Sequence, residues 1–383
     1  MSRSGRFFED IPDRRDTNSL KWGKYSGSDV IPLWVADMDF KSPPEVVDSA
    51  IQAGTFGNFG YCKCPEGLEE AVIQRCVDLY DWRIERSWLV WLPGMVCALN
   101  ACCRTLEKES SQVFTQTPVY PPFLSAPGNF DLPCVHLPMH LNADRFSFDF
   151  QSMDELPTQS SDLFMLCHPH NPVGTVFNRE ELDRFAQWTL ERDLYVCSDE
   201  IHCDLLLEPG LEHIPLASIG PEIADRTITL MAPSKTFNLP GFGCSFAIIS
   251  NGELRRKFKK AISGIVPDPP AMGFTLAETA YRTGEPWRLE LLEYLKGNRD
   301  FALEELGRIT GLTAYPPEAT YLMWIDAREL PVENAHSFFE KAGVGLSDGK
   351  DFGSPGFLRM NLGCSRDLLV EALERMTVAC KDL

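Results

Sequence analysis

Short apolar runs alternate with segments of helical period along much of the chain. Apolar positions at helical spacing predict helices over residues 66–81, 95–106 and 179–192. The short apolar runs end at turn-forming residues and predict strands, which lie at 88–92, 113–116, 163–167, 194–198, 227–231 and 246–250. This alternation is typical of an α/β fold with a mainly parallel, doubly wound sheet.

The pattern changes after about residue 283. A long amphipathic stretch is followed by a short apolar run, a helical segment, a second apolar run and a final helix, which occupy 286–309, 321–326, 332–342, 356–361 and the C-terminal residues. Mixed elements of this kind predict a smaller α+β domain that follows the α/β part of the chain.

Asn171, Asp199 and Lys235 each come at the end of an apolar run that we interpret as a strand. Parallel strands place their carboxyl ends at one edge of a sheet, and ligands of open α/β sheets bind there. We therefore expect these three side chains to lie close together. A lysine that is partly desolvated beside a carbonyl cofactor becomes a Schiff-base nucleophile, so the pattern indicates chemistry of this kind.

Each residue also has an ordinary interpretation when it is taken alone. Lys235 could be a solvated surface lysine, and Asn171 could serve an Asn-Pro turn. Asp199, His202 and the neighbouring acidic residues could be imagined as a metal site. They would alternate between the two faces of a continuing strand, so we expect no metal here.

In combination, these segments resemble the fold-type I pyridoxal-phosphate enzymes of aminotransferase class I/II. The resemblance is carried by Asn-Pro-x-Gly at 171–174, Asp-Glu-Ile at 199–201 and Pro-Ser-Lys at 233–235. More narrowly, the chain resembles the MalY/PatB branch of cystathionine β-lyase-type C–S lyases in Asp-Met-Asp-Phe at 37–40, Ser-Asp-Glu-Ile-His at 198–202 and Ser-Lys-Thr-Phe-Asn-Leu-Pro at 234–240. The resemblance extends from about residue 32 to residue 359.

The resemblance implies a division into two domains and a bound pyridoxal 5'-phosphate. The large cofactor-binding domain would cover residues 44–282, and the small domain would be discontinuous, formed by 1–43 together with 283–383. It also implies a homodimer with active sites at the subunit interface, where Tyr61 would reach the cofactor of the neighbouring chain.

The resemblance further implies a role for each candidate cofactor residue. Lys235 would hold the cofactor and act as the catalytic base, and Asp199 would keep the ring nitrogen protonated. Around the ring, Tyr120 would stack on its face, and Asn171 and His202 would contact its oxygen. His202 departs from the usual aminotransferase pattern, which has tyrosine at this place.

The cofactor phosphate would lie at the start of the helix that follows strand 88–92. There Gly94, Met95 and Val96 offer unpaired backbone N–H groups at the positive end of the helix dipole. Ser234 would add a hydroxyl. Many aminotransferases carry a phosphate-binding arginine where this chain has Gly243, so the resemblance implies compensation from Tyr61 or from backbone donors.

The resemblance also implies which residues bind the carboxylate of the substrate. Arg359 lies in an apolar run, an awkward place for a cation unless it is paired, and the matching arginine of the family holds the substrate α-carboxylate. A salt bridge within the fold is the alternative. Ala36 and Asp37 match a loop that lines the same pocket.

We therefore predict a PLP-dependent carbon–sulfur lyase that eliminates thiol from L-cystathionine or an S-substituted L-cysteine, giving pyruvate and ammonia. The main alternative is a class I/II aminotransferase, because motifs that bind the cofactor do not separate the two reactions. A second alternative is a PLP-containing regulatory protein that acts by binding a partner. The motifs do not specify which sulfur amino acid is used, or in which pathway.

Composition and charge restrict the other possibilities. A net charge of −19 opposes phosphate backbones and anionic lipid surfaces, so we expect neither a nucleic-acid partner nor a membrane partner. The first residues lack the apolar run of a secretory signal, and no run approaches the length of a membrane span. We expect a cytoplasmic enzyme that acts on a small amino acid.

Overall fold

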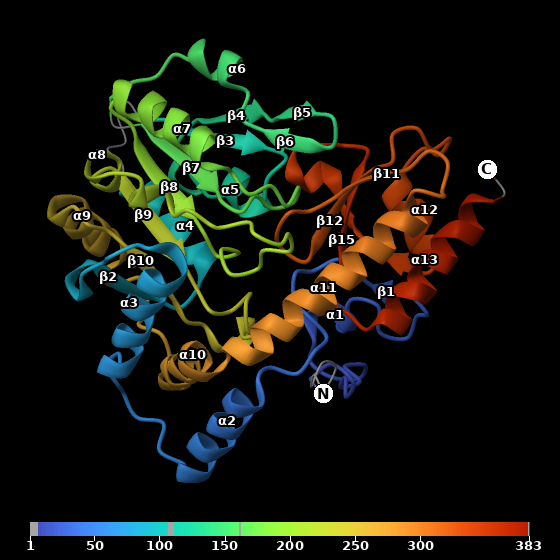
Figure 1. Cartoon of the computed structure of the whole chain (residues 1–383), viewed down its shortest axis with the longest axis horizontal. Helices are drawn as coiled ribbons and strands as arrows, with labels where there is room; N and C mark the ends of the chain where they lie inside the picture. Colours follow the sequence, from blue (N-terminus) through green and yellow to red (C-terminus); the bar gives the residue numbers. More distant parts are fainter. Residues whose placement is uncertain (1–6, 106–110, 161, 382) are drawn as a thin grey trace.

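A seven-stranded sheet forms the centre of the computed structural model, which describes residues 7–105, 111–160, 162–381 and 383. Its strands follow the order β2-β10-β9-β8-β7-β3-β4. Their bounds are β2 Leu89–Leu92, β3 Val113–Thr117, β4 Cys134–Pro138, β7 Leu163–Cys167, β8 Tyr195–Asp199, β9 Thr227–Met231 and β10 Ser245–Ile248. Figure 1 shows helices packed around this sheet.

Five neighbouring strands, β9-β8-β7-β3-β4, run parallel, and β10 is antiparallel to both β9 and β2. The prediction of a mainly parallel α/β sheet is therefore confirmed. Because β7, β8 and β9 are adjacent and parallel, the segments that follow them emerge at one edge of the sheet.

Helices cover both faces of the sheet, as a doubly wound fold requires. Alternate side chains of β7 point to opposite faces: Leu163 and Met165 pack in one core, and Phe164 and Leu166 pack in another. The helices that contribute to the first core include α4 Met95–Arg104 and α9 Gly252–Ile262, and the second core includes side chains of α7 Arg179–Glu191.

Local sequence signals explain where these helices start. Asn178 caps α7: its side chain accepts a hydrogen bond from the Glu181 backbone N–H at 3.0 Å, and the Glu181 carboxylate accepts one from the Asn178 N–H at 2.9 Å. Helix α4 begins after Pro93-Gly94, as predicted, and its described part ends at Arg104. Residue 106, the end of the predicted helix, lies outside the described residues.

A second group of elements follows the sheet along the chain. It contains an antiparallel sheet of order β11-β12-β15-β14 and three longer helices. The bounds are α11 Glu285–Leu306, β11 Thr313–Tyr315, β12 Leu322–Asp326, α12 Ala335–Lys341, β14 Ser347–Asp348, β15 Phe357–Asn361 and α13 Arg366–Cys380. In Figure 1 these orange and red elements lie beside the larger sheet, and α11 runs along the whole group.

The N-terminal segment joins this second group. Strand β1 (Ile31–Pro32) pairs in parallel with β13 (Val344–Gly345), and Ile31 and Leu33 share a core with side chains of α11 and α13. The boundaries 44–282 and 1–43 plus 283–383 stay a prediction, and this shared core supports them.

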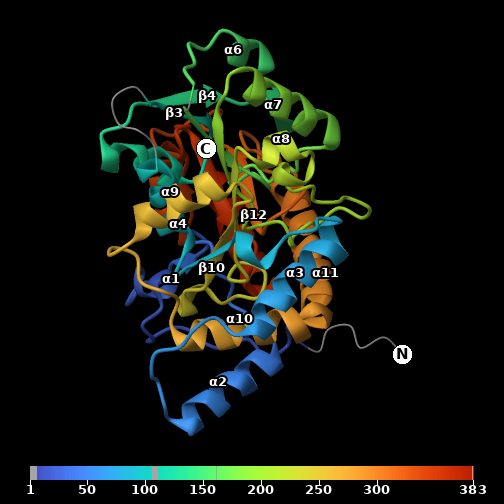
Figure 2. The same ribbon diagram turned by 90° about the vertical axis from the view of Figure 1, so that its left-hand side faces the viewer.

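Two helices, α10 (Ala271–Thr283) and α2 (Pro44–Phe56), were not predicted from the sequence pattern. Helix α10 packs against α3 (Glu66–Tyr80) and against α2. Figures 1 and 2 both show α2 at the lower edge, beyond α10. Only Val46 of α2 is buried, so its apolar residues do not form the inward-facing stripe by which a helix is recognised in sequence.

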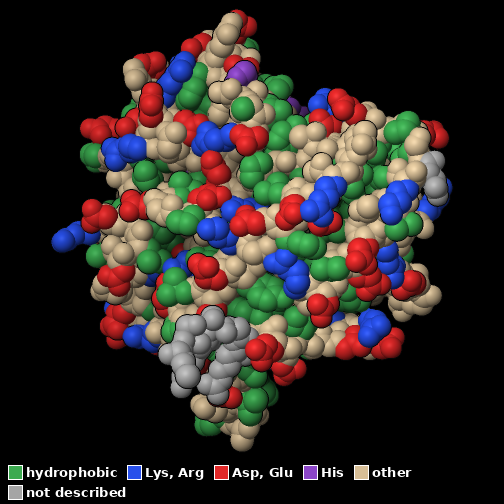
Figure 3. Space-filling view, turned by 45° about the vertical axis from the view of Figure 1, so that its right-hand side comes forward, with side chains coloured by type: hydrophobic (Ala, Val, Ile, Leu, Met, Phe, Trp, Pro, Cys, Tyr) green, Lys and Arg blue, Asp and Glu red, His purple; other side chains and the backbone are tan. Residues whose placement is uncertain are grey.

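The surface is strongly charged. Figure 3 shows acidic and basic side chains interspersed over the face that it presents. Among the residues that the structure describes, no helix combines the length and the apolar character that a membrane crossing requires.

Candidate active site

A cavity of about 470 Å³ lies at the carboxyl ends of β7, β8 and β9, where the second group of elements meets the sheet. Eight of the residues singled out in the sequence line it: Ala36, Met95, Tyr120, Asn171, Asp199, His202, Lys235 and Arg359. The two groups of elements contribute to one cavity although their residues are far apart in sequence.

Lys235 enters this cavity from the loop after β9. The next two residues, Thr236 and Phe237, are fully buried and fix the loop. The Lys235 ammonium donates a hydrogen bond to the backbone oxygen of Ala36, which also accepts one from the Tyr321 hydroxyl at 3.0 Å. Burial, and then the positive charge of Arg359, lower the pKa of Lys235 from 10.5 to about 8.

Asp199 is the last residue of β8, and it is only 3% exposed. Its carboxylate accepts a hydrogen bond from the Ile201 N–H at 3.1 Å, and no cation within the described ranges forms a salt bridge with it. Burial raises its pKa to about 7, against the opposing effect of that hydrogen bond. The arrangement suits a ligand that brings a positively charged N–H group to the carboxylate.

Arg359 lies on β15 and faces the cavity from the second group of elements. Its guanidinium donates to the Asn171 side-chain oxygen at 3.1 Å and to the Trp34 backbone oxygen at 2.9 Å. Its Nε has no hydrogen-bond partner, and no carboxylate of the described chain pairs with it. Burial lowers its pKa to about 10. The internal salt bridge that we considered is thus not formed, and a buried guanidinium without a carboxylate partner fits an anionic ligand.

Asn171 and Tyr120 form one wall. The backbone N–H of Tyr120 donates to the Asn171 backbone oxygen at 3.0 Å, so two loops are held together there. Tyr120 is half-buried and precedes the short helix α5 (Pro121–Ser125). Its aromatic ring is available to the cavity.

His202 completes the polar lining. It is 2% exposed, and its Nδ1 has no hydrogen-bond partner. Burial, with a smaller effect from the charges of Lys235 and Arg359, lowers its pKa to about 3. His202 is therefore neutral at physiological pH, and its ring can offer one donor and one acceptor.

The start of α4 provides a place for an anion. Helix α4 begins at Met95, and its N-cap Gly94 has no side chain to occupy the first N–H groups. Met95 lines the cavity, and Gly94 and Val96 flank it in sequence. Ser234, beside Lys235, is half-buried and is not part of the lining.

The backbone explains why glycine stands at 243. Gly243 has a φ of +58°, a left-handed conformation that side chains disfavour, and a Cβ there would lie 2.8 Å from the Pro93 backbone oxygen. An arginine at this position would require the chain to move. The missing arginine therefore has a steric cause in this fold.

Tyr61 and Asp37 are not brought into the cavity. Tyr61 is fully exposed, in the segment between α2 and α3. The Asp37 carboxylate pairs with Arg14 at 2.8 Å, whereas the backbone of its neighbour Ala36 reaches the cavity. Sequence reasoning also missed Arg14, and nothing in its local pattern marks it as a partner of this loop.

Other residues of the lining escaped the sequence analysis. They are Lys24, Trp34, Val35, Pro121, Pro122, Cys167, Ile201, His336, Leu346, Ser347, Asp348, Asp351 and Phe352. Trp34 lies next to a recognised segment and could have been included from that proximity. Lys24 and His336 give no signal, because only the tertiary path of the chain brings them to the same opening.

Comparison with known proteins places the chain in a family. The family model described as aminotransferase class I and II matches residues 28–376. The chain belongs to the aminotransferase class I and II family. Cystathionine beta-lyase PatB of Bacillus subtilis (strain 168) is 32% identical, and the match covers 97% of this chain and 99% of that protein.

Solved structures agree with this assignment. A structure titled as that of OvoB has a TM-score of 0.95 and 43% identity, covering 98% of this chain and 99% of the other. Cystalysin from Treponema denticola, whose title states that it contains a pyridoxal 5'-phosphate cofactor, has a TM-score of 0.93 and 32% identity, covering 98% of both chains. The fold expected from the resemblance is confirmed.

The lowered pKa of Lys235 predicts a pH-dependent cost to stability. The folded-state pKa of about 8 lies below the usual 10.5, so the unfolded chain binds the extra proton between these values and stability rises with pH there. Lys235→Met should raise the free energy of unfolding of the ligand-free protein by about 2 kcal/mol below pH 8. The gain should shrink as the pH approaches 10.5.

Denaturant unfolding of both proteins between pH 6 and 10 measures this difference. Lys63→Met is the matched control, because it makes the same replacement at an exposed position outside the cavity. A pH-independent effect of Lys235→Met would show that the amine is not desolvated in the folded protein.

Proposed function

We propose that this protein is a pyridoxal-phosphate-dependent carbon–sulfur lyase that acts on an L-amino acid with a sulfur leaving group at Cβ. The observation that carries the proposal is the convergence of Lys235, Asp199 and Arg359 in one cavity. Asp199 and Arg359 are buried and Lys235 is half-buried, and none of them forms a salt bridge with another described residue. The names of the relatives, cystathionine beta-lyase PatB and cystalysin, point to the same chemistry.

The cavity has the donors and acceptors that pyridoxal phosphate requires. When bound, the cofactor supplies an electron sink conjugated to the substrate Cα. Asp199 would hold the proton on the ring nitrogen, and its burial makes that interaction strong. Asn171 and His202 would hydrogen-bond the ring oxygen, and Tyr120 would cover the ring. The start of α4 would bind the phosphate, and the Ser234 hydroxyl would turn toward it from outside the lining.

Substrate binding follows from Arg359 and the loop at Ala36. Arg359 and Lys235 line the same cavity, so a substrate α-carboxylate on the guanidinium would bring its Cα toward the amine. Trp34, whose backbone oxygen orients Arg359, closes this side. Asp37 would act only through the position of its backbone, because Arg14 occupies its carboxylate.

Lys235 would move the proton from the substrate Cα. Its pKa of about 8 leaves a substantial neutral fraction near physiological pH, which a lysine in water lacks. Removal of that proton allows the C–S bond at Cβ to break, and the sulfur leaves as a thiolate. The remaining three-carbon fragment hydrolyses to pyruvate and ammonia.

Product analysis tests elimination against aminotransfer. With L-cystathionine or an S-substituted L-cysteine, the purified holoenzyme should form thiol, pyruvate and ammonia in equal amounts, over many turnovers and without added keto acid. Lys235→Met should lower turnover by at least about a thousandfold, because the other lysine of the described lining, Lys24, is paired with Glu340.

Two other outcomes would contradict the lyase. A reaction that stops after one equivalent and resumes only when a keto acid is added would establish aminotransfer. A protein that binds the cofactor but turns over neither substrate would favour the regulatory alternative.

A homodimer with shared active sites is the second part of the proposal. Helix α2 and the segment after it expose apolar side chains that one chain leaves uncovered: Val47, Ile51, Phe56, Phe59 and Tyr61. Phe56 and Phe59 are 80% and 70% exposed, more than a monomer would present without a partner surface. A second copy of this chain would cover them and bring its Tyr61 to the phosphate end of the cavity.

Mixing two defective chains tests this arrangement. If Tyr61→Phe and Lys235→Ala subunits exchange, a mixed dimer has one site with both residues intact, so random reassociation should restore about a quarter of wild-type activity. Each variant mixed with itself is the control. Absence of recovery despite demonstrated exchange would place Tyr61 outside the partner's site.

A cytoplasmic location stays a prediction. All thirteen cysteines are free thiols in the structure, and most are buried as small apolar residues. This pattern fits a reducing compartment.

A further inference from the structure

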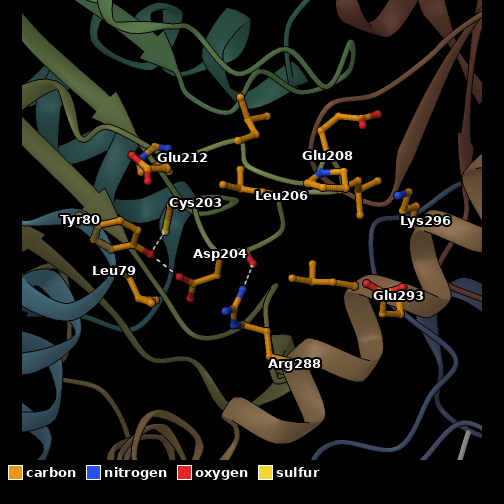
Figure 4. Close-up of a pocket in the computed structure, with 15 residues that line it drawn as sticks. Leu79, Tyr80, Cys203, Asp204, Leu206, Glu208, Glu212, Arg288, Glu293 and Lys296 are labelled. Atoms are coloured by element: carbon orange, nitrogen blue, oxygen red, sulfur yellow. Dashed lines mark hydrogen bonds between the residues drawn. The ribbon is translucent and has the colours of Figure 1, made fainter. Parts of the chain in front are cut away.

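Asp204 is a buried carboxylate to which the proposed chemistry gives no role. It is 4% exposed and lies five residues after Asp199, where the chain turns away from β8. Figure 4 shows it beside Tyr80 and Arg288, on the floor of a cleft of about 340 Å³. A carboxylate so deeply buried must be paired, and its partners show what it holds.

The Asp204 carboxylate binds residues from two separate segments. One oxygen accepts hydrogen bonds from Arg75 Nε at 3.2 Å and from the Thr236 hydroxyl at 3.2 Å. The same oxygen forms an ion pair with Arg75 Nη2 at 2.9 Å. The other accepts from the Tyr80 hydroxyl. Although burial alone would raise the pKa of Asp204, the positive charges of Arg75 and Arg288 hold it below its usual value.

The backbone of Asp204 also binds a third element, helix α11. Its carbonyl oxygen accepts a hydrogen bond from Arg288 of α11 at 2.8 Å, and Arg288 is itself paired with Glu285. Figure 4 shows the first of these contacts. Asp204 thus connects α3, α11 and the loop after β9.

The turn that carries Asp204 separates two cavities. Ile201 and His202 line the active-site cavity, whereas Cys203 and Asp204 line the cleft on the other side. A displacement of Asp204 would therefore move the active-site wall as well as the cleft.

Thr236 is the link from Asp204 to the amine. It is fully buried, and it immediately follows Lys235 in the chain. The next residue, Phe237, is buried too, and the Arg75 guanidinium lies 5.7 Å from the centre of its ring. The Asp204–Arg75 pair therefore holds both residues that come after Lys235, so the direction of the lysine side chain depends on it.

We propose that Asp204 is a positioning residue that orients Lys235 through the hydroxyl of Thr236. The inference rests on the proposed function only in taking Lys235 as the reacting amine. Reacting groups must be placed within a fraction of an ångström, so loss of this anchor should slow the proton transfer more than it weakens substrate binding, which Arg359 provides.

The experiment compares Asp204→Asn, Thr236→Val and Thr236→Ser holoenzymes. Asn keeps the shape of Asp204 without its charge, and Val removes the hydroxyl of Thr236 with almost no change in volume. Both should lower kcat by roughly ten- to a hundredfold while KM changes by less than about twofold. Thr236→Ser should restore most of kcat, because its hydroxyl can make the same bond.

Two further measurements distinguish an effect on the orientation of Lys235 from a general loss of protein stability. The visible absorption of the bound cofactor should titrate with a midpoint displaced by roughly half a pH unit or more in Asp204→Asn and Thr236→Val, because the surroundings of the Lys235 nitrogen change. The double variant should be no slower than the slower single variant, since the two residues act through one bond.

Asp162→Asn is the matched control. Asp162 is also fully buried, but it lies at the opposite, amino end of β7, where it accepts from the Gln112 N–H at 2.9 Å and the Gln159 N–H at 2.9 Å. Its replacement should lower the unfolding temperature without changing kcat or the absorption midpoint.

Failure of the positioning role can be distinguished from failure of the proposed lyase function. A wild-type protein without turnover or without cofactor on Lys235 would contradict the proposed function. An active wild type whose Thr236→Val variant keeps its kcat and its absorption midpoint would overturn the role of Thr236. If Asp204→Asn fails to fold, Thr236→Val still decides.

Discussion

Burial of charge without an internal partner is the constraint on which this structure depends. Lys235, Asp199 and Arg359 are drawn into one cavity, and burial displaces the pKa of each toward its neutral form. Desolvation of these groups lowers the stability of the folded chain, and binding of a ligand with complementary charges offsets that loss. A site that weakens the empty fold while preparing it for a ligand is typical of enzymes that sacrifice stability for activity.

The architecture brings these charges together from both parts of the chain. The parallel strands β7, β8 and β9 deliver Asn171, Asp199 and Lys235 to one edge of the sheet. Arg359 arrives from β15 and hydrogen-bonds Asn171 across 188 residues of sequence. Because Arg359 and Lys235 stand on different groups of elements, their distance depends on contacts between the groups, among them that of α11 with Asp204.

The sequence could predict those parts of the site that follow from local order. Asp199 ends one apolar run and Lys235 lies four residues after the next one, so the adjacent parallel strands bring both to the same edge of the sheet. Lys24 and His336 could not be found, because their approach depends on the tertiary path and leaves no local pattern. The same holds for the bond between Asp204 and Thr236, two buried residues that are 32 positions apart. Helix α2 was missed because its apolar residues face outward.

In the proposed mechanism, Lys235 is the amine on which the cofactor is carried. Borohydride reduction of the purified protein with pyridoxal phosphate, followed by proteolysis and mass mapping, tests it most directly. We expect one cofactor adduct per chain, on the peptide that contains Lys235, and none in Lys235→Met under the same conditions. A stoichiometric adduct on any other lysine would contradict it.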